Sequence, residues 1–270
     1  MKYLKTVSHL LQIVMTPLRS NWAFFTFIYL LGCICAWVTL PDTRGAKLYD
    51  NLYPELFLDV YVLATILTIL PRRVKPWIRG FFYFVLYTAA VVDVYCFVKF
   101  QSTLTPTMLL LVGETDSREA GEFIRSCVSP DILMSGVGWV LLLMAVHILT
   151  AIKLRFPHFV PRNWCRLVRS ILVQSRFFLH RVRHVTEFAV LALLVFSIVM
   201  SAHNKAATMK LMTGKTIGDV EHTLTEKDHA VLYQPIYRLA FSIYANTLTA
   251  KQVDKLIATA DKVRVDSCSF

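Results

Sequence analysis

The sequence predicts an all-α polytopic membrane protein with five transmembrane helices and further helices on the membrane surface. Of the 270 residues, 56% are hydrophobic and only 17% are charged, whereas an average soluble domain is about 25% charged. The hydrophobic residues are concentrated in five long stretches, and the loops between them carry basic and acidic residues in strict alternation. Because segments that stay in the cytoplasm are enriched in Lys and Arg, this alternation predicts both the spans and their orientation.

Each hydrophobic stretch approaches the ~20 residues that a helix needs to cross about 30 Å of hydrocarbon. A helix is required because lipid offers no partner to an unpaired backbone group. The first stretch is interpreted as an uncleaved span rather than a cleaved signal peptide, since it is long and no Ala-x-Ala sequence follows it. The predicted spans are residues 21–40, 55–70, 78–100, 131–152 and 184–202, of which the second and fifth are short.

The loop charges place the N-terminus in the cytoplasm and the C-terminus outside. Residues 1–20, 71–80 and 153–184 carry Lys and Arg but no Asp or Glu. We expect these basic segments to face the anionic lipids of the inner leaflet, so the net charge of +11 is attributed to the membrane and not to nucleic acid. The acidic residues of the opposite loops are Asp42, Asp50, Glu55, Glu114, Asp116, Glu119 and Glu122.

The long basic segment between the fourth and fifth spans predicts a surface helix. Hydrophobic residues recur at helical spacing over residues 162–183, with most arginines on the other face. Such a basic amphipathic helix lies in the headgroup region, where we interpret it as an anchor; a regulatory or partner-binding site is the alternative. His147 and Glu187 lie at matching depth in the two flanking spans, which predicts a structural pair between them.

Two carboxylates on the outer side predict a polar site there. Asp59 lies at the outer end of the second span, and Asp93 lies about two turns below the outer end of the third. A carboxylate buried in a membrane protein is costly unless it is paired or hydrated. The two residues therefore indicate a polar cavity that opens outward.

The segment between the third and fourth spans is expected to form a helix that faces this cavity. Pro106 is suited to the first position of a helix. Thr115 and Glu119 are four residues apart and share one helical face, with Glu122 as a near neighbour. From spacing alone, a solvated charged face is the default interpretation of these three residues.

Residues 203–270 are too polar to span a membrane and are expected outside. Tyr233, Tyr237, Phe241 and Tyr244 recur at helical spacing on a stretch that starts near Pro235. This pattern predicts a helix on the outer membrane surface, because Tyr favours that interface. Thr249 is expected to cap a following helix over residues 250–260. Two cysteines, Cys127 and Cys268, also lie outside, where they pair with each other or Cys268 pairs elsewhere. The cysteines have no zinc-ligand spacing.

The layout and two short stretches resemble the membrane domain of bacterial phosphoethanolamine transferases. These belong to the sulfatase/alkaline-phosphatase superfamily and include lipid A modifiers that confer polymyxin resistance. The first stretch is TDSREAGEF at Thr115–Phe123, and the second comprises residues 237–256 and 261–270. The family commonly carries Asn one turn before the Thr, whereas this chain has Leu111 there. The resemblance implies a transmembrane domain over residues 1–202 in the bacterial inner membrane, followed by a periplasmic membrane-surface linker over 203–270.

The resemblance also implies a function. The family's membrane domain binds phosphatidylethanolamine, and Thr115 and Glu119 match positions used at the lipid headgroup. A carboxylate there is suited to the donor's ammonium; Glu122, Asp93 and Asp59 are further lipid-binding candidates. The domain then positions a zinc-dependent periplasmic domain, which transfers phosphoethanolamine to lipid A or another lipopolysaccharide or glycan acceptor.

The family's catalytic groups are expected past Phe270. They are a Thr nucleophile in a Gly-Glu-(Ser/Thr) stretch and a set of zinc ligands. Gly113-Glu114-Thr115 mimics that tripeptide, but no Asp and His set for a metal surrounds it. We therefore expect this chain to hold no catalytic residue and no metal, and to be inactive alone.

Two other functions stay open at this stage. A related transferase could move phosphoglycerol, but its donor has no ammonium and Glu119 would lose its purpose. The chain could instead be a non-enzymatic membrane adaptor or lipid-binding protein. A transporter is disfavoured because the five spans show no internal repeat.

Overall fold

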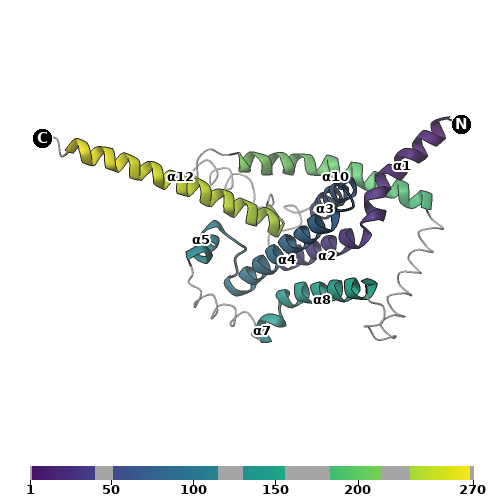
Figure 1. The fold of residues 1–270 in the computed structure, drawn as a ribbon, viewed down its shortest axis with the longest axis horizontal. Helices are drawn as coiled ribbons and strands as arrows, with labels where there is room; N and C mark the ends of the chain where they lie inside the picture. Colours follow the sequence, from purple (N-terminus) through teal and green to yellow (C-terminus); the bar gives the residue numbers. More distant parts are fainter. Residues whose placement is uncertain (1, 40–50, 115–129, 156–182, 214–231, 268–270) are drawn as a thin grey trace. The chain divides into compact units, whose positions relative to one another are not determined.

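The computed structural model describes residues 2–39, 51–114, 130–155, 183–213 and 232–267. The regular secondary structure in these ranges is helical, and every element of four or more residues is an α-helix (Figure 1). The helices are α1 (Lys2–Ser20), α2 (Trp22–Thr39), α3 (Leu52–Ile69), α4 (Lys75–Phe100), α5 (Pro106–Glu114), α7 (Pro130–Leu133), α8 (Gly136–Arg155), α10 (Arg183–Met212) and α12 (Pro235–Ser267). The all-α prediction is confirmed for the part of the chain that the structure covers.

Four helices are long and apolar enough to cross a membrane: α2, α3, α4 and the Val185–Ala202 part of α10. They correspond to the first, second, third and fifth predicted spans, with boundaries that differ by a few residues. Many of their large hydrophobic side chains are exposed, such as those of Trp37, Ile69 and Phe84. An exposed hydrophobic surface on a long apolar helix is the form that lipid contact requires.

The fourth predicted span differs from the observed structure. Residues 131–152 were expected to form one helix, but a turn at Met134 and Ser135 separates α7 from α8. Ser135 begins α8 because its Oγ accepts the backbone N–H of Val137 at 3.4 Å, as an N-cap residue does. The apolar part of α8, Gly136–Ile152, is shorter than the four long helices.

The chain forms two compact units. The first contains residues 1–34, 51–87 and 138–201, and the second contains residues 35–50, 88–137 and 202–270. Helices α2, α4, α8 and α10 each contribute residues to both units. The division expected from the sequence, into a span domain over 1–202 and a linker over 203–270, stays a prediction.

In the first unit, α1 packs against α3. The hydroxyl of Tyr61 donates to the backbone carbonyl of Val14 at 2.9 Å. Asn21 occupies the turn between α1 and α2, and its Nδ2 donates to the carbonyl of Ala64 at 3.0 Å and to Oγ1 of Thr68 at 2.9 Å. These bonds fix the start of the first long apolar helix against α3.

The expected pair between His147 and Glu187 is wrong. Glu187 is buried, and its Oε1 accepts a hydrogen bond from Arg19 at 2.7 Å. His147 instead lies 3.1 Å from the hydroxyl of Tyr87 through Nδ1. Its ring stacks on Phe27 with centroids 4.3 Å apart. Similar depth in two spans does not by itself make two residues pair. Here each of the two side chains contacts a residue on another helix.

In the second unit, α12 packs against α5. The expected helix break at Thr249 is wrong, because α12 continues from Pro235 to Ser267. Oγ1 of Thr249 donates to the carbonyl of Ala245 at 3.1 Å, so its hydroxyl bonds backward within one helix rather than capping a new one. Residues 251–260 are all exposed, which marks where the packed part of α12 ends.

Several predictions fall outside the described residues and stay predictions. They are the basic surface helix over 162–183, the pairing of Cys127 and Cys268, and the TDSREAGEF stretch.

Candidate functional site

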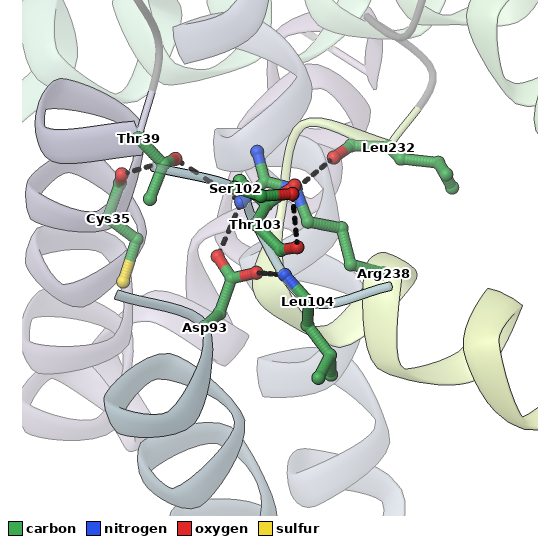
Figure 2. Close-up of polar contacts among 8 residues, drawn as sticks. All are labelled: Cys35, Thr39, Asp93, Ser102, Thr103, Leu104, Leu232 and Arg238. Carbon is green, nitrogen blue, oxygen red and sulfur yellow. Dashed lines mark hydrogen bonds and ion pairs between the residues drawn. The ribbon is translucent and has the colours of Figure 1, made fainter. Parts of the chain in front are cut away.

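The second unit holds a buried ion pair that ties three helices together. Asp93 on α4 is fully buried, at 0% exposure, and Arg238 on α12 is 6% exposed. Nη1 of Arg238 donates to Oδ2 of Asp93 (Figure 2). We refer to Asp93, Arg238 and the hydrogen-bond partners of these two residues as the Asp93 cluster.

Arg238 makes two further hydrogen bonds within the cluster. Its Nε donates to the carbonyl of Leu232 at 2.8 Å, and Nη1 also donates to Oγ1 of Thr39 at 3.2 Å. Thr39 is the last residue of α2, and its hydroxyl donates to the carbonyl of Cys35 at 2.8 Å. The guanidinium therefore joins the end of α2, the C-terminal part of α4 and the beginning of α12 (Figure 2).

The second oxygen of Asp93 is also engaged. Oδ1 accepts the backbone N–H of Leu104 at 3.0 Å. Removing two charges from water is expensive, and their attraction compensates only when further hydrogen bonds satisfy the remaining atoms. Here both carboxylate oxygens have a donor and the guanidinium has three acceptors. Removal of either partner alone would leave a buried charge, which typically costs about 3–5 kcal/mol.

The contact with Leu104 positions the start of α5. Helix α4 ends at Phe100, and the next residue, Gln101, has a φ of 54° in the left-handed region that often terminates helices. Oγ1 of Thr105 then accepts the N–H of Met108 at 3.3 Å, so Thr105 is the N-cap and Pro106 the first residue of α5. The prediction that Pro106 begins a helix is confirmed.

Helix α12 also makes a hydrogen bond to the start of α5. Nδ2 of Asn246 donates to the carbonyl of Pro106 at 3.1 Å. The start of α5 is thus held by Asp93 through Leu104 and by Asn246 through Pro106. Helix α5 ends at Glu114, directly before the Thr115 that begins the TDSREAGEF stretch.

A second cation contacts the beginning of α12. Nζ of Lys205, on α10, donates to the hydroxyls of Tyr237 at 2.7 Å and Tyr233 at 3.2 Å. It also lies 4.7 Å and 5.4 Å from the centroids of the two rings, within cation–π range. Tyr233 is buried, so this aromatic residue packs inside the unit, whereas the sequence suggested a tyrosine at the membrane surface.

The predicted site residues are not all brought together. Asp93 is the centre of the cluster, whereas Asp59 is half-buried on α3 and belongs to the first unit. Thr115, Glu119 and Glu122 lie outside the described residues. Their place at a lipid headgroup, and a cavity that opens outward, stay predictions.

Sequence reasoning missed Arg238, Thr39 and Lys205. A signal for the first was available: Arg238 is the one charged residue between positions 232 and 250. An isolated charge in such a stretch requires a counter-ion, and Asp93 was the unpaired carboxylate at a comparable position in another apolar segment. Thr39 and Lys205 carry no comparable signal, because their roles depend on which helices meet.

Among the described residues, no group of three or more His, Cys, Asp or Glu residues is arranged to hold a metal ion. The four long apolar helices define the chain as a helical membrane protein. Comparison with family models, curated proteins and solved structures finds no match to this chain.

Proposed function

We propose that this chain is the membrane domain of a phosphoethanolamine transferase of the bacterial inner membrane. It binds phosphatidylethanolamine in the outer leaflet and positions a periplasmic zinc-dependent catalytic domain. That domain transfers phosphoethanolamine to lipid A or to another lipopolysaccharide or glycan acceptor. The proposal includes five spans, a cytoplasmic N-terminus and a periplasmic C-terminus. It is supported by the TDSREAGEF stretch, the loop charges and the long apolar helices.

One structural observation carries the proposal. Asp93 bonds Leu104 on one side and Arg238 on the other, so it links the approach to α5 with α12. Because α5 leads directly into Thr115, a fixed start of α5 limits where the following residues can lie. A binding site requires its contacting residues to be held by a supporting layer of hydrogen bonds and packing, and the Asp93 cluster is suited to that role.

The chemistry of the headgroup assigns a role to each predicted residue. The ammonium of the donor lipid needs an anionic partner, which Glu119 supplies through a charge-assisted hydrogen bond. In the proposed site the hydroxyl of Thr115, four residues before Glu119 in the sequence, bonds a headgroup oxygen. The chain contributes positioning to the transfer, since a lipid held in one orientation reacts more readily than one that diffuses freely.

The test is lipid binding by the purified chain in nanodiscs, with phosphatidylethanolamine compared with phosphatidylglycerol. We expect a preference for phosphatidylethanolamine that Glu119→Gln abolishes. Asp254→Asn is the matched control, because it removes a carboxylate from the exposed part of α12 and should leave the preference unchanged. Equal binding of both lipids by the parent chain would contradict the proposal, and a preference for phosphatidylglycerol would favour the phosphoglycerol alternative.

A further inference from the structure

In the first unit, the short connection between α3 and α4 carries four positive charges. They belong to Arg72, Arg73, Lys75 and Arg79. The three arginines are exposed and the lysine is partly buried. No Asp or Glu occurs over residues 60–92, so these charges have no acidic neighbour in the sequence. We call the four residues the basic turn.

The folded chain does not neutralise the basic turn. Among the described residues, none of its four side chains forms an ion pair with a carboxylate, whereas the nearby Arg19 is paired with Glu187. Nζ of Lys75 donates to Oγ of Ser20 at 3.1 Å, and this neutral acceptor leaves the charge in place. Lys75 and Arg79 are four residues apart on α4 and share one face, where like charges repel. A bound anion would remove that repulsion.

The hydrophobic residues beside the basic turn indicate its depth in a membrane. Ile69, at the end of α3, is 79% exposed, and Trp77, in the first turn of α4, is 81% exposed. Exposed hydrophobic residues on the apolar helices are suited to lipid, and Trp is enriched where a span meets water. The exposed basic residues lie between these two positions. We therefore expect the basic turn at the level of the lipid phosphates.

Hydrogen bonds hold the basic turn in a defined position. The bond from Lys75 to Ser20 joins it to the end of α1. Asn21, the next residue, bonds the carbonyl of Ala64 and the hydroxyl of Thr68 on α3. Helix α4 also begins at Lys75, which adds the partial positive charge of a helix N-terminus. A set of cations held in place favours one specific anionic ligand, because less freedom is lost on binding.

We propose that the basic turn binds a phospholipid that carries two phosphodiester groups, such as cardiolipin. Four cations exceed the charge of one phosphodiester, whereas two linked phosphates offer two anions and enough acceptor oxygens for all four side chains. Clusters of Lys and Arg at the cytoplasmic ends of spans recognise anionic headgroups, cardiolipin among them. The inference goes beyond the proposed function, because in the predicted orientation this turn faces the leaflet opposite the donor lipid.

The test is a titration of the purified 270-residue chain in detergent micelles, with bound lipid counted by native mass spectrometry. Cardiolipin, phosphatidylglycerol and phosphatidylethanolamine are compared at equal phosphate concentration. We expect cardiolipin to bind about tenfold more tightly than phosphatidylglycerol, because its second phosphate adds charge-assisted contacts. The double variant Lys75→Gln/Arg79→Gln should lower cardiolipin affinity about thirtyfold, the combined effect of two cations at a lipid surface.

A matched control separates this site from a general effect of charge. Lys251 and Lys255 are also four residues apart on one helix and are exposed, so Lys251→Gln/Lys255→Gln makes the same change in net charge. It should leave cardiolipin affinity unchanged. Without lipid, both double variants should unfold at the midpoint of the parent chain, because the replaced side chains lie at the surface or form no ion pair.

Three outcomes would overturn the inference. Equal affinity for cardiolipin and phosphatidylglycerol would indicate a diffuse attraction to anionic lipid. Parent-like cardiolipin affinity in Lys75→Gln/Arg79→Gln would place the lipid elsewhere, and an equal loss in both double variants would reduce the effect to net charge. Glu119→Gln should leave cardiolipin binding unchanged, so this inference and the proposed function fail or stand independently.

Discussion

Arg238, one turn into α12, donates to the buried carboxylate of Asp93, which lies 145 residues earlier in the chain. This pair decides how the last helix of the chain is attached to the second unit. Both side chains are buried, so the attachment of α12 depends on the ion pair between them.

Breaking this pair should destabilise the fold strongly. Asp93→Asn or Arg238→Met should each lower the free energy of unfolding by about 3–5 kcal/mol, because the remaining partner is left buried and incompletely matched. The double variant should lose less than the sum of the two. Denaturant titration in detergent micelles measures all three values. Additive losses, or single variants within error of the parent, would show that the pair does not stabilise the protein.

Gly136 lies so close to Val38 that a side chain at position 136 should not fit without a shift. A Cβ at Gly136 would lie 3.0 Å from Cγ2 of Val38 and 3.3 Å from its Cβ, closer than packed carbon atoms normally approach. Gly136→Ala should therefore cost about 1–3 kcal/mol through overpacking, and Val38→Ala should relieve part of that cost. Gly80→Ala is the matched control, because nothing lies within 4 Å of its added Cβ. It should be neutral or stabilising by up to about 1 kcal/mol. Thermal unfolding midpoints of these variants test the prediction. Equal changes for Gly136→Ala and Gly80→Ala would contradict the close contact between Gly136 and Val38.

Loss of the contact between Asn246 and Pro106 should loosen α5. Asn246→Ala removes the hydrogen bond from α12 to the first residue of α5, so amide hydrogens of α5 should exchange with solvent faster. We expect protection to fall about tenfold, corresponding to one net hydrogen bond of about 1 kcal/mol. Thr247→Ala, an exposed neighbour, serves as the comparison. If α5 exchanges at the parent rate in Asn246→Ala, that hydrogen bond does not hold the helix.

The continuity of α12 predicts the effect of proline near residue 250. Ala250→Pro should disrupt the helix, because proline inside a helix removes a backbone donor at a cost of about 3 kcal/mol. If Thr249 instead capped a new helix, proline at the next position would be favourable. Circular dichroism distinguishes the two: reduced helicity supports one continuous helix, and unchanged or increased helicity supports two.

The candidate site was only partly predictable. The depth of Asp93 in an apolar stretch marked it as a residue that needs a partner, and the residue types around Pro106 predicted where α5 begins. The partner of Asp93 was not predictable, because Arg238 lies in a segment that was interpreted as a helix on the membrane surface. The same limitation explains the wrong pair between His147 and Glu187, whose partners are Tyr87 and Arg19.

The sequence by itself determined the helical class, four long apolar helices and most of their boundaries. These depend on local properties, since a helix in lipid needs only a long apolar stretch and backbone bonds between residues four apart. Only the tertiary structure decided which charges are neutralised and why Thr249 lies inside a helix. Those outcomes depend on which helical faces meet, and side chains separated by more than a hundred residues meet only after the helices pack.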